Sequence, residues 1–207
     1  MKILTIPVGM IGTNCYLLCS EAGNCAVIDP GDNAGLILRK MQALSLTPKM
    51  ILFTHGHYDH IGAADGLKRM IGQPLPAYIH KADDEMIRDP EKNFSTAILG
   101  GDGFATTADY FVQDGDTLTL DELTIKVIAT PGHTRGGVSY LVGDTLFTGD
   151  TLFAGSVGRT DLYGGSFLSL SASVKKLAAL SGDYKVLPGH GPASTLEQER
   201  MGNPYMG

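Results

Sequence analysis

Short apolar runs recur along the first half of the chain, and each of them ends at turn-forming residues. Runs of four to eight residues bounded by Gly, Pro, Asn or Asp are typical of β-strands. Between two such runs, Ile37, Leu38, Met41 and Leu44 fall on one face of a helix, which Pro48 ends. The pattern predicts strands at residues 1–7, 14–19, 25–28, 49–53 and 77–79, and helices at residues 34–46, 63–71 and 81–87.

The second half of the chain shows the same order, with strands followed by helices. Two successive sets of this kind predict an α/β protein whose two mixed sheets lie face to face with helices outside, a four-layer αββα sandwich. No linker or low-complexity segment divides the chain, so we expect residues 1–207 to form a single domain. The strands are predicted at residues 117–120, 123–130, 137–142, 145–148 and 184–187, and the helices at residues 167–180 and from about residue 195.

One long segment, residues 88–109, has neither periodicity, and Gly100, Gly101 and Gly103 follow one another closely within it. Connections of this length inside a domain are usually disordered or functional. We expect this segment to form a lid that faces the substrate.

Composition and charge narrow the possible functions. The chain is 43% hydrophobic and 18% charged, as in globular proteins. Its net charge is −6 with scattered Lys and Arg, which predicts no nucleic-acid partner. No apolar run approaches the roughly 18 residues of a membrane span, so no membrane association is expected. Three cysteines, an odd number, argue against a disulfide framework and favour a cytoplasmic protein with free strand thiols.

The segment Thr54-His55-Gly56-His57-Tyr58-Asp59-His60 places three imidazoles and one carboxylate within six positions, directly after an apolar strand. Imidazole and carboxylate groups are the ligands that zinc and similar divalent metals prefer in proteins. The alternative is a solvated polar loop. The density of ligand-type side chains predicts a metal site.

Three later segments repeat one arrangement: an apolar strand, a glycine-containing bend and then one metal-binding type of side chain. These side chains are His133, Asp150 and His190, and five of the six histidines thereby fall in such segments. Seven donors exceed one tetrahedral zinc but suit two metals that share a bridging carboxylate, for which Asp150 is the candidate. The sixth histidine, His80, follows a strand and is expected to have a structural role.

In the order and spacing of these donors, the chain resembles the metallo-β-lactamase superfamily over nearly its whole length. The resemblance implies the αββα fold and two metal ions per chain, with zinc favoured and iron or manganese also accepted by such donors. It further implies that the first metal is bound by His55, His57 and His133, the second by Asp59, His60 and His190, and that Asp150 bridges them.

Within that superfamily the chain is most similar to the glyoxalase II group, the hydroxyacylglutathione hydrolases, and to its short bacterial members without a C-terminal helical domain. Residues 54–60, 130–134, 148–153, 155–161 and 189–192 carry this similarity. It implies a small-molecule partner, a thioester such as S-lactoylglutathione or a related hydroxyacyl thioester. A hydroxide held between the metals would cleave it, and Asp59 would act as the catalytic residue that orients the nucleophile.

The substrate-binding candidates are Arg159 and Tyr163. Long glyoxalases II have Lys-Phe-Tyr where this chain has Arg159-Thr160-Asp161, with Tyr163 nearby. Arg159 can hold a carboxylate through two hydrogen bonds. The alternative is a structural arginine paired with Asp161.

Three other functions remain open at this point. Persulfide dioxygenases share the fold and use one iron, bound at the counterparts of His55, His133 and Asp150. A hydrolase of lactones, esters or phosphodiesters would need the same two metals. A metal-binding module without catalysis is the third alternative.

Overall fold

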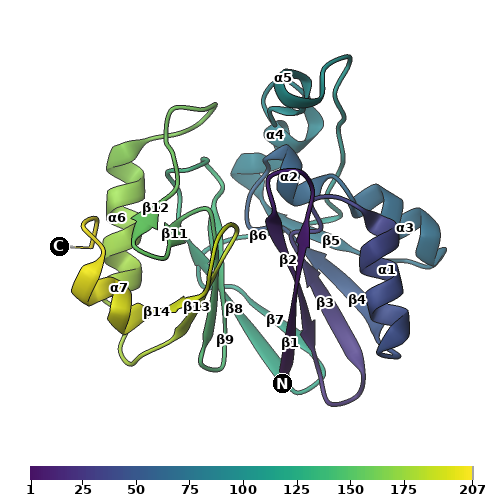
Figure 1. The fold of residues 1–207 in the computed structure, drawn as a ribbon, viewed down its shortest axis with the longest axis horizontal. Helices are drawn as coiled ribbons and strands as arrows, with labels where there is room; N and C mark the ends of the chain where they lie inside the picture. Colours follow the sequence, from purple (N-terminus) through teal and green to yellow (C-terminus); the bar gives the residue numbers. More distant parts are fainter. Residues whose placement is uncertain (207) are drawn as a thin grey trace.

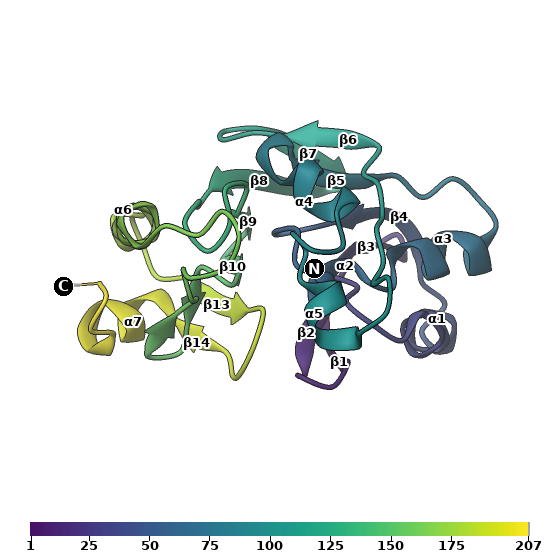
Figure 2. The same ribbon diagram turned by 90° about the horizontal axis from the view of Figure 1, so that it is seen from above.

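The computed structural model describes residues 1–206 and shows two sheets packed face to face, with helices on both outer sides. Figures 1 and 2 place α1 and α3 outside the first sheet and α6 and α7 outside the second. The predicted αββα sandwich is confirmed. No helix within residues 1–206 is long and apolar enough to cross a membrane.

The first sheet has the strand order β1-β2-β3-β4-β5-β6, so each strand pairs with its neighbour in the sequence. The first pairings are antiparallel, whereas β3 to β6 run parallel and are joined through helices. Its strands are β1 Lys2–Val8, β2 Thr13–Cys19, β3 Asn24–Ile28, β4 Thr47–Leu52, β5 Ala77–His80 and β6 Tyr110–Val112. Its helices are α1 Ala34–Ala43, α2 Tyr58–Ile61, α3 Ala64–Ile71, the 3₁₀ turn η1 Lys81–Asp83, α4 Asp84–Arg88 and α5 Ser95–Leu99.

The second sheet has the order β14-β13-β10-β9-β8-β7. Strand β10 runs parallel to β13 and antiparallel to β9. Its strands are β7 Thr117–Leu120, β8 Leu123–Ala129, β9 Val138–Val142, β10 Thr145–Gly149, β13 Lys185–Pro188 and β14 Ser194–Thr195. A small separate ribbon consists of β11 Leu152–Phe153 and β12 Ser156–Val157, and the helices are α6 Phe167–Ala178 and α7 Leu196–Gly202.

Strand β2 shows why other layers pack against both faces of the first sheet. All seven of its residues are buried, and successive side chains point to opposite faces of the sheet. Leu17 belongs to the cluster between the first sheet and helices α1 and α3, whereas Leu18 belongs to the cluster between the two sheets. A third cluster, which includes Leu146 and Leu177, lies between the second sheet and its helices.

Element boundaries differ from the sequence predictions in a few places. Helix α1 ends at Ala43 rather than near residue 46, because Ser45 adopts a left-handed conformation with φ of 53°. The predicted lid, residues 88–109, contains the short helix α5, and β6 follows it directly. Cys15, Cys19 and Cys25 are free and buried in strands, as predicted.

Candidate metal centre

Four loops that follow β4, β8, β10 and β13 converge at one end of the two sheets. They carry the seven predicted donors, which therefore come from both sheets. Because β10 and β13 are parallel neighbours, Asp150 and His190 emerge side by side. The structure thus brings all seven predicted side chains together.

Two glycines allow the loops to approach one another. Gly149 has φ of +49°, and a Cβ there would lie 2.4 Å from Thr54 Oγ1. A Cβ on Gly189 would lie 2.2 Å from Asp150 Oδ1. Any larger residue at either position would push apart the loops that hold the donors.

The donors form groups whose ligand atoms lie within 4.8 Å of one another. One group is His55, His57 and His133, and another is Asp59, His60 and His190. His57 Nδ1 and His133 Nε2 are 2.8 Å apart, close to the roughly 3.3 Å between two nitrogens on one tetrahedral zinc. These are the two groups that the sequence assigned to separate metals.

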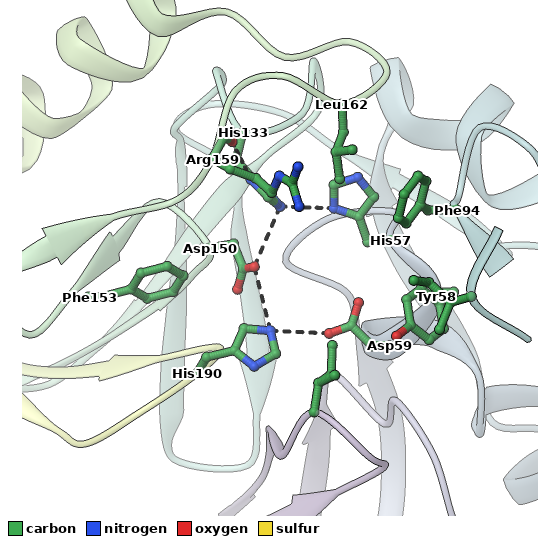
Figure 3. A pocket seen from close by; sticks show the side chains of 12 residues that line it. His57, Tyr58, Asp59, Phe94, His133, Asp150, Phe153, Arg159, Leu162 and His190 are labelled. Atoms are coloured by element: carbon green, nitrogen blue, oxygen red, sulfur yellow. Dashed lines mark hydrogen bonds and ion pairs between the residues drawn. The ribbon is translucent and has the colours of Figure 1, made fainter.

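Asp150 lies between the two groups. Its Oδ2 atom is 3.5 Å from His133 Nε2 and 3.6 Å from His190 Nε2 (Figure 3). Its Oδ1 atom is 3.4 Å from His60 Nε2. A carboxylate between the two groups would be within reach of an ion held by either group. Its position fits a bridging ligand.

Several polar atoms of the cluster are buried and have no hydrogen-bond partner among the described residues. They include Nε2 of His55, Nε2 of His60 and Oδ1 of Asp150. A buried polar atom without a partner is costly, and native structures rarely contain several together. These orphaned atoms face the cluster, so the residues present fit a divalent metal.

Burial and neighbouring charges set the protonation of the cluster. Burial, reinforced by nearby imidazoles, holds the pKa of His55 far below its usual value and lowers the pKa of His57 to about 3. Both are thus neutral with free lone pairs. Burial alone would raise the pKa of Asp59, but the imidazoles, His60 first, hold it well below its usual value. Neutral imidazoles and an ionised carboxylate are the states that bind metals.

His60 differs from the other buried imidazoles. Burial would lower the pKa of His60, but the carboxylates of Asp59, Asp150 and Asp29 outweigh this effect and raise it well above its usual value. A metal at this position would therefore displace the His60 proton.

Asp29 orients two of the imidazoles, a role that the sequence did not reveal. The Nδ1 atom of His60 lies 2.9 Å from Asp29 Oδ2, and Thr54 donates to both Asp29 oxygens. Thr54 Oγ1 in turn lies 3.1 Å from Nδ1 of His55. Groups of this kind fix the tautomer, so that the opposite ring nitrogen points at the metal.

Asp83 is a second residue that sequence reasoning missed. Its buried carboxylate accepts hydrogen bonds from Gly56 N, Thr134 Oγ1 and Gly136 N. Gly56 lies between two predicted ligands, and Thr134 follows a third. Asp83 therefore joins the two loops that supply the first group of donors.

The two substrate-binding candidates lie in different environments. Arg159 borders the cavity beside the cluster, but its guanidinium makes two 2.7 Å hydrogen bonds to Asp161. This is the structural pairing that the sequence also allowed. Its carbonyl lies 2.7 Å from His133 Nδ1. Tyr163 is not part of the cavity lining and contacts Arg135 and Glu85 instead. His80 lies outside the cluster and accepts a bond from Ala82 N, a structural role as expected.

A cavity of about 480 Å³ opens beside the donors (Figure 3). This size falls within the usual range for small-molecule sites. Phe94 and Ile98 of the predicted lid segment belong to its wall, so this part of the segment faces the cavity. The apolar and aromatic side chains that line the cavity are Ile11, Tyr58, Phe94, Ile98, Phe153 and Leu162.

Comparisons with known proteins agree with this geometry. The profile of the metallo-beta-lactamase superfamily matches residues 8–190. The hydroxyacylglutathione hydrolase GloC of Haemophilus influenzae is 35% identical, covering 100% of this chain and 98% of its own. Among solved structures, the B3 metallo-beta-lactamase BLEG-1 is 37% identical with a TM-score of 0.93, covering 99% of both chains. TTHA1623 in a di-iron-bound form is 34% identical with a TM-score of 0.86, covering 98% of this chain and 99% of its own.

Proposed function

The chain belongs to the metallo-beta-lactamase superfamily of metallo-hydrolases, and from this membership we propose that it hydrolyses thioesters at a two-metal centre. The seven proposed ligands are His55, His57 and His133 on one ion, Asp59, His60 and His190 on the other, and Asp150 between them. Zinc is the metal we propose. The same donors suit iron, and TTHA1623 binds two irons in its own structure.

The position of Asp150 supports this proposal most directly. It lies between two groups of three donors, with one oxygen within 3.6 Å of both His133 and His190. A one-metal enzyme would leave the second group without a purpose, although burying its charged side chains is costly.

Divalent ions bound there would lower the pKa of water to about 7 and polarise a substrate carbonyl. Asp59 lies in the cavity lining, where Thr13 Oγ1 donates to its Oδ2 atom at 2.7 Å. Held in this way, its carboxylate can orient the attacking water. The water oxygen bonds to the carbonyl carbon while the carbon–sulfur bond breaks, yielding a carboxylate, a thiol and one proton.

Two features favour a thioester over other acyl compounds. A thiolate is a good leaving group with an ordinary pKa near 8.5, so the reaction requires no separate general acid. GloC, similar over the full chain, is a hydroxyacylglutathione hydrolase by name.

No cysteine belongs to the cavity lining, which fits direct attack by water rather than by a protein nucleophile.

To test this proposal, the purified protein is loaded with zinc, iron or manganese, and the number of metal ions per chain is measured. Turnover is then measured on S-lactoylglutathione, a β-lactam and a phosphodiester, and oxygen consumption on a persulfide. We expect two metals per chain and thioester hydrolysis. One iron per chain with oxygen consumption on the persulfide would overturn the proposal, as would turnover of the β-lactam or phosphodiester alone.

A further inference from the structure

The cavity beside the donors has an apolar wall built from segments far apart in the sequence. Ile11 comes from the turn between β1 and β2, Phe94 and Ile98 from the lid segment, and Leu162 from the loop after β12. Figure 3 shows Phe94 and Leu162 beside His57, whereas Phe153 lies beside Asp150 and His190. Apart from Arg159, which Figure 3 also shows beside His133 and His57, the His57 side of the cavity is therefore bordered by apolar side chains.

The wall offers few partners for a polar or charged substrate group. Apart from the proposed metal ligands, only Tyr58 and Arg159 among residues 1–206 bring polar side-chain atoms to the lining. The Arg159 guanidinium is already held by two hydrogen bonds from its Nε and Nη2 atoms to Asp161. A hydroxyl placed against Phe94 or Leu162 would lose water without gaining a partner.

The contacts around Phe94 hold its backbone in an unusual conformation. Phe94 has φ of +72°, a left-handed conformation that bulky residues rarely adopt and that persists only where surrounding contacts impose it. Those contacts come from buried Asn93, whose side chain donates to Phe104 O and accepts from Ser95 N. The carbonyl of Asn93 also accepts from Tyr58 N, within the segment that carries the donors.

From this arrangement we propose that the acyl group of the substrate is an extended apolar chain, bound by Phe94, Ile98 and Leu162. This inference rests on the proposed thioester hydrolysis and specifies its substrate class. A carbonyl next to His57 and His133 directs its acyl chain along these three side chains. A lactoyl group is too short to cover them.

The first experiment uses thioesters of one neutral thiol, N-acetylcysteamine, so that only the acyl group changes. Acetyl, butanoyl, hexanoyl and lactoyl thioesters are compared on the zinc-loaded protein. Burial of each methylene predicts that kcat/KM rises about fourfold per added methylene, and that the hexanoyl compound exceeds the lactoyl compound at least tenfold. Equal or faster turnover of the acetyl or lactoyl compound would overturn the inference while leaving thioester hydrolysis intact.

Substitutions in the apolar wall test whether its side chains cause the preference for longer acyl chains. Phe94→Ala and Ile98→Ser should reduce the hexanoyl-to-acetyl ratio of kcat/KM at least threefold. Ile98 is 44% exposed, so its replacement carries little risk for folding. Phe167→Ala is the matched control, because Phe167 is 60% exposed and lies outside this cavity. A ratio unchanged in both lid variants would overturn the assignment.

Calorimetry supplies a readout independent of turnover. Hexanoate should bind the zinc-loaded protein at least tenfold more tightly than acetate, with a negative heat-capacity change from apolar burial. The Ile98→Ser variant should weaken the binding of hexanoate but not of acetate. If no thioester is hydrolysed yet hexanoate binds in this way, the proposed function fails and the apolar subsite stands. If acetate binds as tightly as hexanoate, the subsite itself is wrong.

Discussion

At the scale of single residues, Asp59 is the side chain whose replacement best separates chemistry from folding. It lies at the cavity, with Thr13, His60 and His190 around its carboxylate. Asp59→Asn keeps the shape of the side chain but removes its negative charge. We expect kcat/KM on a thioester to fall at least about a hundredfold, because even an outer partner of a ligand contributes 10- to 100-fold. Metal content should fall toward one ion per chain while the near-ultraviolet circular dichroism is retained.

The control for this change is Asp121→Asn, which alters an exposed carboxylate bonded to Ser20 and Asn24 far from the cluster. It should leave turnover unchanged. Full activity in Asp59→Asn would remove both the second metal and the orienting carboxylate from the mechanism.

Asp83 should matter through the loops that it joins. Asp83→Asn replaces one acceptor oxygen by an NH₂ group, which cannot accept from the donors of Gly56, Thr134 and Gly136. We expect metal affinity to fall 10- to 100-fold and the free energy of unfolding to fall by about 1–3 kcal/mol. Titration with zinc and urea denaturation measure the two effects.

The matched control is Asp84→Asn, the next residue, whose carboxylate pairs with Arg88 at the surface. It should change neither quantity by more than about 0.5 kcal/mol. Unchanged zinc affinity in Asp83→Asn would show that Asp83 supports the fold alone.

The sequence revealed the donors but not the residues that orient them. His55 and its partners are conspicuous because imidazoles cluster in glycine-containing bends after strands. Asp29 and Asp83 act through hydrogen bonds to groups 25 to 53 positions away, such as Thr54 N and Gly136 N. Such contacts depend on the completed fold, and a single aspartate after a strand or in a short helix carries no local signal.

At the scale of elements, four side chains connect helix α4 and the lid segment to the loops after β8 and β12. We call them the Tyr163 clamp: Glu85, Lys92, Arg135 and Tyr163. The Tyr163 hydroxyl donates to Glu85 and accepts from Arg135. The charged groups of Lys92 and Arg135 lie over its ring. Glu85 and Lys92 come from the first half of the chain, whereas Arg135 and Tyr163 come from the second. The clamp thus joins elements that come from both halves of the chain and border the cavity.

Tyr163→Phe should free these elements with little effect on global stability. The contacts are exposed, so the free energy of unfolding should change by less than about 1 kcal/mol. We expect faster amide hydrogen exchange in residues 89–95 and 159–165. Tyr184→Phe, which also removes an exposed hydroxyl, is the control. A raised KM with unchanged exchange would instead support the substrate-binding role that the sequence suggested for Tyr163.

The missed elements share a physical cause. Helix α5 has only five residues and β6 only three, too few to show a helical or alternating period. The longer strands were predicted within one or two residues, because burial on one or both faces imposes a clear pattern. The lid could be located from its lack of periodicity, but not the inward placement of Phe94, which depends on the contacts of Asn93.

At the scale of the whole molecule, the sandwich places one set of donors at the end of each sheet. His55, His57, Asp59 and His60 follow a strand of the first sheet, whereas His133, Asp150 and His190 follow strands of the second. Each proposed metal takes donors from both sides. Metal binding should therefore hold the two sheets together as well as support the reaction.

This arrangement predicts that removal of metal destabilises the entire fold. A ligand that binds only the folded state at 100 times its dissociation constant adds about 2.7 kcal/mol, so two zinc ions add about 5.4 kcal/mol, or roughly 11–22 °C in Tm for a chain of this size. Zinc added to chelated protein should raise Tm by that amount and slow amide exchange at the ends of both β4 and β13. His190→Gln, which retains the first group of donors, should keep about half of the increase. An unchanged Tm, or protection confined to one sheet, would contradict a metal centre shared between the sheets.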